Sequence, residues 1–313
     1  MFDIQVCGLS QRMRFIGARH AVIGISGGLD STLALLVAVA TFDAMGLPRE
    51  GIIGVTMPGL GTSTHTKDNA LELMKLLGIT SLTIDITEAC LQHFAAIGHD
   101  PQVQDVVYEN TQARERTQIL MDLANKYNAP VIGTGDLSEL ALGWCTYNGD
   151  HMSMYSVNAG VPKTAVQIIV SRLAEIERFG AELSEVLRSI VATPISPELK
   201  PTDEAGGIDQ KTEDLVGPYE LHDFFLYNFL GYGYDPEKIF YLAKVAFEGK
   251  YEPKVIKRWL REFYRRFFAQ QYKRNCMPDG PKVAAVSLSP RGYWRMPSDV
   301  SPKAWLAAVD ALS

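Results

Sequence analysis

The residues best suited to chemistry lie at 26–31, where the sequence reads Ser-Gly-Gly-Leu-Asp-Ser. Adjacent glycines let backbone N–H groups approach phosphate oxygens, and Ser26 and Ser31 can donate hydrogen bonds to the same oxygens. Asp30 can hold the Mg²⁺ that accompanies a nucleoside triphosphate. The chain contains no Gly-x-x-x-x-Gly-Lys-Ser/Thr motif, so this is not a Walker loop. The stretch predicts a phosphate site of another type; the alternative is an ordinary glycine-rich turn.

The stretch at 133–150 combines acids, glycines and aromatic rings. It follows an apolar run and contains Asp136, Glu139 and Asp150. Buried acids need water or a cation, so acids beside a phosphate loop favour Mg²⁺, with Asp30 and Glu139 as its ligands. Trp144 and Tyr147 offer flat surfaces for an aromatic ring. The alternative is a set of surface acids and a packed tryptophan.

Two further signals are weak when taken alone. In the segment 109–116, Asn110 and Arg114 lie near one face of an expected helix. Asparagine can recognise an amide or hydroxyl group, and arginine can pair with phosphate. A solvated charged helix start would have the same composition. Lys163 is one of 30 lysines and arginines and would by itself be read as a surface residue.

Short apolar runs alternate with amphipathic or apolar segments along the first half of the chain. The expected strands are 21–26, 51–57, 81–86 and 130–134, and the expected helices are 29–46, 64–78, 87–97 and 109–127. This alternation predicts an α/β fold with a doubly wound parallel sheet. Ligands of such sheets bind beyond the carboxyl ends of the strands, where the strand order reverses. We expect segments 26–31, 58–66 and 134–150 to face one crevice there.

The remaining pattern divides the chain into four parts. We expect a lead-in helix at 1–20, a core at 21–192, a flexible lid-like loop at 193–217 and a helical C-terminal part at 218–313. The core ends in helices that begin at Pro162 and at Glu182. The C-terminal part contains expected helices at 235–247 and 252–275, the second of which is basic and aromatic.

Composition excludes several classes of function. The net charge of −6 argues against nucleic-acid binding. The four cysteines are scattered, which argues against a zinc or redox site and favours a reducing compartment. The N-terminus lacks the pattern of a signal peptide, and no apolar run is long enough to span a membrane. We therefore expect a cytoplasmic protein that binds neither membranes nor nucleic acids.

Taken together, four motifs closely resemble the synthetase domain of glutamine-dependent NAD⁺ synthetase. They are the segments 26–31, 109–116, 133–150 and 161–164, and the likeness spans nearly the whole chain. The first motif alone indicates only the N-type ATP pyrophosphatase (PP-loop) superfamily. The resemblance implies a C–N ligase that adenylates the carboxylate of deamido-NAD⁺ with ATP and then amidates it with ammonia. The products are NAD⁺, AMP and pyrophosphate.

The resemblance also assigns roles by matching position. The residues implied to bind ATP are Gly24, Ser26, Gly27, Gly28, Leu29, Asp30, Ser31, Arg114, Thr134 and Lys163. Those implied to bind deamido-NAD⁺ are Asn110, Glu139, Trp144, Cys145, Thr146, Tyr147, Asp150 and Lys282. Asp30 and Lys163 are the implied catalytic residues. Lys163 would balance the charge on the phosphates. Asp30 and Glu139 are the implied Mg²⁺ ligands. Two positions depart from the family pattern: Tyr293 stands where aspartate is expected, and Cys145 where alanine is expected.

The resemblance implies partners as well. We expect a homodimer with the dinucleotide site close to the subunit interface. Full-length relatives carry an N-terminal glutaminase with a Glu-Lys-Cys triad, and nothing before residue 20 could form it. The chain is then a lone synthetase domain, a fragment, or a protein supplied by free ammonia or a separate glutaminase. We expect NH₄⁺ to support turnover and glutamine alone not to.

Two functions from other classes compete with this interpretation. A tRNA-modifying adenylase or thiolase would share the phosphate loop but usually has a basic face and a cysteine pair. The basic aromatic segment 254–274 is its only support, and a helix with its aromatics inward explains that segment more simply. A non-catalytic nucleotide-binding module would not need Asp30, Glu139 and Lys163 together.

Overall fold

The computed structural model describes residues 1–61, 64–193 and 215–313. Its sheet has five parallel strands in the order β3-β2-β1-β4-β5. The strands are β1 (Ala21–Gly24), β2 (Ile52–Thr56), β3 (Thr80–Thr83), β4 (Val131–Gly133) and β5 (Tyr155–Ser156). The predicted α/β fold with a parallel sheet is confirmed. The fifth strand was missed because two residues carry too little periodicity to be recognised.

Helices connect the strands and continue beyond them. Around the sheet they are α1 (Phe2–Ile16), α2 (Leu29–Met45), α3 (Thr64–Leu77), α4 (Thr87–Ile97), α5 (Val106–Tyr127), α6 (Leu137–Leu142), α7 (Lys163–Glu175) and α8 (Ala181–Ala192). The C-terminal helices are α10 (Tyr219–Tyr232), α11 (Pro236–Ala246), α12 (Pro253–Ala269), α13 (Gln271–Asn275) and α14 (Lys303–Asp310). A short 3₁₀ turn at Arg49–Gly51 precedes β2. Among the residues that the structure describes, no helix is both long and apolar enough to cross a membrane.

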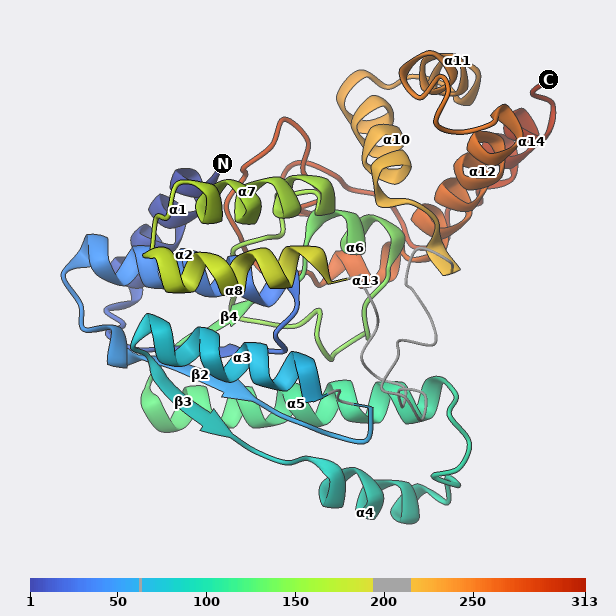
Figure 1. Cartoon of the computed structure of the whole chain (residues 1–313). Helices are drawn as coiled ribbons and strands as arrows, with labels where there is room; N and C mark the ends of the chain where they lie inside the picture. The colour runs from blue at the N-terminus through green and yellow to red at the C-terminus, as the bar shows by residue number, and fades with distance from the viewer. Residues whose placement is uncertain (62–63, 194–214) are drawn as a thin grey trace.

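Helices cover both faces of the sheet (Figure 1). One face packs against α1, α2, α3, α7 and α8 in a core that includes Leu9, Leu35 and Met74. The other face packs against α4 and α5 through Phe94 and Tyr108. Because both faces are covered, the three central strands β2, β1 and β4 are mainly apolar, as in other parallel sheets, whereas the edge strand β3 is polar and partly exposed. The sheet is therefore doubly wound, as predicted.

The C-terminal helices form a second apolar cluster beside the sheet (Figure 1). In α12 the aromatic side chains, among them Phe263 and Phe267, are fully buried, while Arg261 and Arg265 remain exposed at the surface. The basic aromatic helix is thus a packed amphipathic helix with its aromatic side chains inward, as predicted. The predicted single helix at 252–275 is wrong, because the chain breaks at Gln270 and starts α13 there.

Helices α10 and α14 were not predicted from the sequence. Most of the lid-like loop predicted at 193–217 lies outside the described residues. The predicted division into four parts therefore stays a prediction.

The strand order reverses at β1, which lies between β2 and β4. The segments that follow β1 and β4 therefore leave the same edge of the sheet side by side. These are the predicted phosphate loop and the predicted acidic stretch. The third predicted segment, 58–66, falls partly outside the described residues, and its end at Thr66 lies against Gly27.

Candidate active site

The loop after β1 turns tightly onto the N-terminus of α2. The backbone N–H of Gly28 donates to Ser26 Oγ at 3.1 Å, and Ser31 Oγ donates to the Gly28 carbonyl at 3.0 Å. Gly27 has φ +90°, and a Cβ there would collide with the backbone carbonyl of Thr66. No side chain caps α2. Its first N–H groups therefore remain available for an anion.

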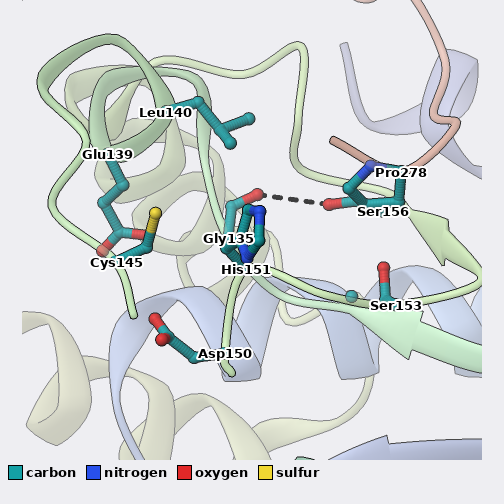
Figure 2. A pocket seen from close by; sticks show the side chains of 10 residues that line it. Gly135, Glu139, Leu140, Cys145, Asp150, His151, Ser153, Ser156 and Pro278 are labelled. Carbon is teal, nitrogen blue, oxygen red and sulfur yellow. Dashed lines mark hydrogen bonds between the residues drawn. The ribbon is translucent and has the colours of Figure 1, made fainter. Parts of the chain in front are cut away.

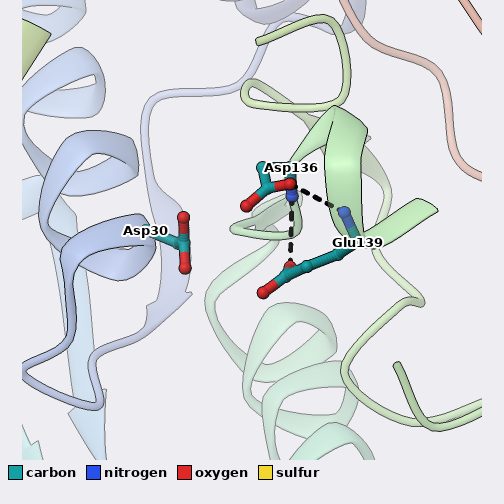
Figure 3. A group of neighbouring side chains, drawn as sticks. All are labelled: Asp30, Asp136 and Glu139. Atoms are coloured by element: carbon teal, nitrogen blue, oxygen red, sulfur yellow. Dashed lines mark hydrogen bonds between the residues drawn. The ribbon is translucent and has the colours of Figure 1, made fainter. Parts of the chain in front are cut away.

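Three carboxylates meet beside this loop. Asp30 lies in the first turn of α2, while Asp136 and Glu139 lie at the start of α6 (Figure 3). One oxygen from each side chain lies within 4.8 Å of the others. Asp136 and Glu139 form a capping box, in which Glu139 N donates to Asp136 Oδ1 at 2.8 Å and Asp136 N donates to Glu139 Oε2 at 3.3 Å. The two predicted metal ligands, Asp30 and Glu139, thus lie in one cluster.

Lys163 lies at the centre of these carboxylates. Its Nζ atom is 2.5 Å from Asp30 Oδ2, 2.7 Å from Asp136 Oδ2 and 2.9 Å from Glu139 Oε1. The lysine is the first residue of α7 and is 2% exposed. The ring of Tyr219 covers it, with the ring centre 5.3 Å from Nζ. In this structure Lys163 therefore neutralises the three carboxylates. To contact a phosphate, its ammonium group would have to give up one of these ion pairs or bind the phosphate in addition to them.

Burial and charge shift the pKa values of the cluster. Burial raises the pKa of Asp30 to about 6, partly opposed by Lys163, and burial together with Asp136 raises the pKa of Glu139 well above its usual range. For Lys163, burial acts to lower the pKa, but Asp136, Asp30 and Glu139 outweigh it and raise the pKa well above its usual value. Lys163 thus stays charged, and an added cation would favour ionised carboxylates.

The residues of this cluster fit a hard divalent cation. Carboxylate oxygens are the ligands that Mg²⁺ prefers. Oδ1 of Asp30 is buried and has no hydrogen-bond partner among the described residues. Asp136 belongs to the cluster although the sequence did not assign it a ligand role. Its position three residues before Glu139, just after a strand, was the available signal, because an N-cap aspartate faces the same way as the first helical turn.

A buried asparagine that the sequence analysis missed joins the two loops. Asn158 Nδ2 donates to the backbone carbonyls of Asp30 and Thr134, both at 3.0 Å. Its Oδ1 accepts a 2.9 Å hydrogen bond from Gln5 in α1. Both side chains are fully buried. Asn158 therefore fixes the phosphate loop relative to the end of β4, and nothing in the local sequence indicated this role.

The segment 143–151 folds against the start of α5. Thr146 Oγ1 donates to Asn110 Oδ1 at 2.7 Å, and Thr146 N donates to Asp150 Oδ1 at 2.7 Å. Arg114 Nε donates to the backbone carbonyl of Tyr147 at 3.3 Å. The structure thus brings together most of the residues predicted to contact the dinucleotide.

The aromatic residues of this segment differ in how they are placed. The ring of Tyr147 is 42% exposed and stacks on His151 with 5.4 Å between ring centres. It therefore presents a flat surface, as the sequence predicted. Trp144 is partly buried, and the guanidinium of Arg266 lies 5.3 Å from its ring centre. Burial raises the pKa of the Cys145 thiol, which disfavours its thiolate form.

Lys282 is the predicted site residue that the described contacts do not join to the others. Its Nζ atom lies 4.4 Å from the ring centre of Tyr293. Tyr293 is the residue that departs from the family pattern, and it now has a local role as a cation–π partner. Any contact of Lys282 with a dinucleotide therefore remains a prediction.

A narrow pocket lies beside Glu139, the one cluster residue in its lining (Figure 2). Glu139, Cys145 and Asp150 line one side, and Ser153, Ser156 and Pro278 line the other. Its free volume of about 10 Å³ is enough to hold roughly one water molecule. The pocket is too small for a nucleotide but large enough for ammonia.

Helix α13 holds the segment between α6 and this pocket. Lys273 Nζ donates to the carbonyls of Gly143 and Cys145 at 2.8 and 2.7 Å. The fully buried Arg274 donates to the carbonyls of Leu140 and Ala141 at 3.2 and 3.0 Å, where α6 ends. These hydrogen bonds satisfy the last carbonyls of α6. Local sequence patterns could not indicate these hydrogen bonds, because they join residues more than 125 positions apart.

Comparison with known proteins identifies the family. A family model described as NAD synthase matches residues 3–266. The chain belongs to the NAD synthase family. A glutamine-dependent NAD(+) synthetase from Mycobacterium bovis is 45% identical over 332 aligned residues, which cover 99% of this chain and 49% of the relative. The chain thus spans about half the length of the curated relatives it matches.

Solved structures of this family share the fold. A glutamine-dependent NAD(+) synthetase from Cytophaga hutchinsonii aligns with a TM-score of 0.78 over 98% of this chain and 55% of its own, at 21% identity. An NMN synthetase from Francisella tularensis aligns with a TM-score of 0.58 over 80% of this chain and 94% of its own, at 27% identity. The predicted PP-loop type of α/β fold is therefore confirmed.

Proposed function

We propose that this chain is a C–N ligase that makes NAD⁺ from deamido-NAD⁺, ATP and ammonia. The observation that carries the proposal is the position of Lys163 among three carboxylates, directly beside a phosphate loop, in a chain of the NAD synthase family. A module that only bound nucleotide would not need this buried charge cluster, because buried charges are costly unless they serve a purpose.

The proposed reaction has two steps. A carboxylate oxygen of deamido-NAD⁺ attacks the α-phosphorus of ATP, and the bond to pyrophosphate breaks. The nitrogen of ammonia then attacks the acyl carbon, the bond to AMP breaks, and one proton leaves. Adenylation is needed because a carboxylate reacts poorly with an amine. The protein mainly has to hold two anions in line and neutralise their charge.

Most of the residues predicted to bind ATP then have a role in holding it. The backbone N–H groups of Gly27 and Gly28, with the hydroxyls of Ser26 and Ser31, bind phosphate oxygens. Arg114 and Thr134 contact the nucleotide. Mg²⁺ held by Asp30 and Glu139, with Asp136 beside them, would supply positive charge to the triphosphate. Lys163 supplies a second positive charge, and Asn158 keeps the loops that carry these groups in register.

The segment 143–151 is proposed to hold the acceptor. The exposed ring of Tyr147 stacks against a base or the pyridine, and Asn110, Thr146 and Asp150 form a hydrogen-bonded network that orients it. One structural neighbour is named an NMN synthetase, which makes the mononucleotide the competing acceptor. An exposed aromatic surface in addition to the phosphate loop favours the larger dinucleotide.

Ammonia is the proposed nitrogen donor. The pocket behind Glu139 admits a molecule of about the size of one water, which fits ammonia and excludes glutamine. The carboxylates of Glu139 and Asp150 in its wall suit an ammonium ion. A glutaminase domain or a separate glutaminase is the proposed source, and a homodimer is the proposed assembly; both rest on the family resemblance.

The test combines the chain with Mg-ATP, ammonium and either deamido-NAD⁺ or its mononucleotide half. We expect NAD⁺, AMP and pyrophosphate in equal amounts with the dinucleotide, and little turnover with the mononucleotide or with glutamine in place of ammonium. Formation of ADP and phosphate would refute adenylation. A preference for the mononucleotide would change the acceptor and leave the mechanism intact.

A further inference from the structure

Asp223, in α10, lies outside every motif of the sequence analysis but is tied to the acid–lysine cluster. Its carboxylate accepts hydrogen bonds from Ser138 Oγ, from Thr164 N at 3.1 Å and from Thr164 Oγ1 at 2.7 Å. Ser138 belongs to α6 and Thr164 to α7. A single carboxylate from the C-terminal helices thus contacts α6 and α7, two of the three helices that carry the cluster.

The start of α7 lacks a side-chain cap within its own segment, which is why this contact is needed. The N-cap residue is Pro162, whose side chain cannot accept a hydrogen bond. The first two N–H groups of the helix are satisfied from other elements instead. Lys163 N donates to Ser138 Oγ at 2.9 Å, and Thr164 N donates to Asp223 Oδ2. Ser138 and Asp223 therefore replace the missing cap.

The same hydrogen bonds set the position of Lys163. Ser138 lies between Asp136 and Glu139 in α6, and it donates to Asp223 while accepting from the backbone of Lys163. This chain of bonds holds the first residue of α7 against the first turn of α6. The placement of the Lys163 ammonium among the carboxylates depends on that register, because Lys163 lies on α7 whereas Asp136 and Glu139 lie at the start of α6.

We propose that Asp223 is a positioning residue, which acts through Ser138 and Thr164 to hold Lys163 among Asp30, Asp136 and Glu139. Asp223 thereby supports binding of a magnesium–nucleotide complex without touching the nucleotide. The identity of the nucleotide rests on the proposed function. The contribution of Asp223 to the geometry does not.

Calorimetric titration of the chain with α,β-methylene-ATP in the presence of Mg²⁺ tests the proposal. We expect Asp223→Asn and Ser138→Ala each to weaken binding about tenfold, the usual effect of removing a partner that orients ligands. Asn228→Ala is the matched control, since Asn228 is also a buried polar residue of α10, but its side chain donates to the carbonyl of Phe224 in its own helix. It should bind within about twofold of the wild type.

The titration separates positioning from folding. A variant that is merely less folded shows fewer binding sites with an unchanged Kd, whereas a misplaced cluster shows a full site count with a raised Kd. If Asp223→Asn does not fold, the Kd of Ser138→Ala by itself tests the proposal. Wild-type Kd values in both variants, or equal weakening in Asn228→Ala, would overturn the proposal. Because binding is measured without turnover, this result stands apart from whether the chain makes NAD⁺.

Discussion

The ammonium of Lys163 and the carboxylate of Asp30 lie 2.5 Å apart, although 133 positions separate them in the chain. Asp30 starts α2 after the first strand, and Lys163 starts α7 after the last strand. Their pairing brings the two ends of the sheet-forming region together at the phosphate loop. Substitutions in the cluster around them therefore test whether these residues act together in the proposed site.

Lys163→Met should impair both stability and activity. Removing the lysine leaves three carboxylates without their cation, and breaking a buried ion pair in this way costs about 3–5 kcal/mol. Denaturant unfolding measures this loss, and added Mg²⁺ should restore more stability to the variant than to the wild type. NAD⁺ formation should fall by about 100-fold or more, as for loss of a charge that stabilises a transition state. Wild-type unfolding and activity would contradict the central role of Lys163.

Asp136→Asn and Asp136→Ala should distinguish the contribution of Asp136 as the N-cap of α6 from the contribution of its negative charge. Asparagine still caps α6 but lacks the negative charge, whereas alanine removes both. We expect the alanine variant to unfold about 1 kcal/mol more easily than the asparagine variant. Both should turn over deamido-NAD⁺ about tenfold more slowly than the wild type. Normal turnover by Asp136→Asn would restrict Asp136 to capping.

Gly27→Ala should abolish ATP binding, whereas Gly46→Ala should not affect it. Both glycines have positive φ, at +90° and +67°, so both variants carry backbone strain of about 1–2 kcal/mol. Only at Gly27 would the added methyl also strike a backbone carbonyl, that of Thr66; nothing lies within 4 Å of it at Gly46. Binding of α,β-methylene-ATP to purified variants makes the comparison. Equal affinities would show that the loop adapts and does not bind phosphate.

Lys273→Met should raise the KM for deamido-NAD⁺ by about tenfold and leave the KM for ATP unchanged. The lysine holds two carbonyls of the acceptor segment and has no described contact with the phosphate loop. Lys303→Met, at the exposed start of α14, is the matched control and should behave as the wild type. Steady-state kinetics in each substrate measures both constants. An equal rise in both KM values would indicate a general loss of structure.

His222 should make stability depend on pH. Its Nε2–H donates to the carbonyl of Val216 at 2.6 Å, and burial lowers its pKa to about 4 from 6.5. Above pH 6.5 both states are neutral, but below it the unfolded state takes up a proton that the folded state refuses, so stability falls as pH falls. His222→Phe lacks this effect, and groups such as Asp30 are shared and cancel in the comparison. The stability advantage of the wild type over His222→Phe should shrink by about 2 kcal/mol between pH 7 and pH 5. A constant difference would show that the histidine does not titrate in this range.

Patterns of short range determined much of this protein by themselves. The glycines and serines at 26–31 predicted the phosphate loop, and alternating apolar runs predicted four of the five strands. Such features depend on residues within one turn or one strand, so local periodicity and backbone preference reveal them. The resemblance of four motifs then indicated the NAD synthase family, which the family comparison confirmed.

The tertiary structure alone decided how these parts meet. That Lys163 lies among three carboxylates, that Asn158 joins two loops and that Asp223 caps α7 are consequences of contacts between distant segments. The two-residue strand β5, the break at Gln270 and the helices α10 and α14 likewise depend on packing against other elements. A single sequence shows which side chains are capable of chemistry. Only the folded chain places them, because their neighbours are set by the order of the strands and by burial rather than by position along the chain.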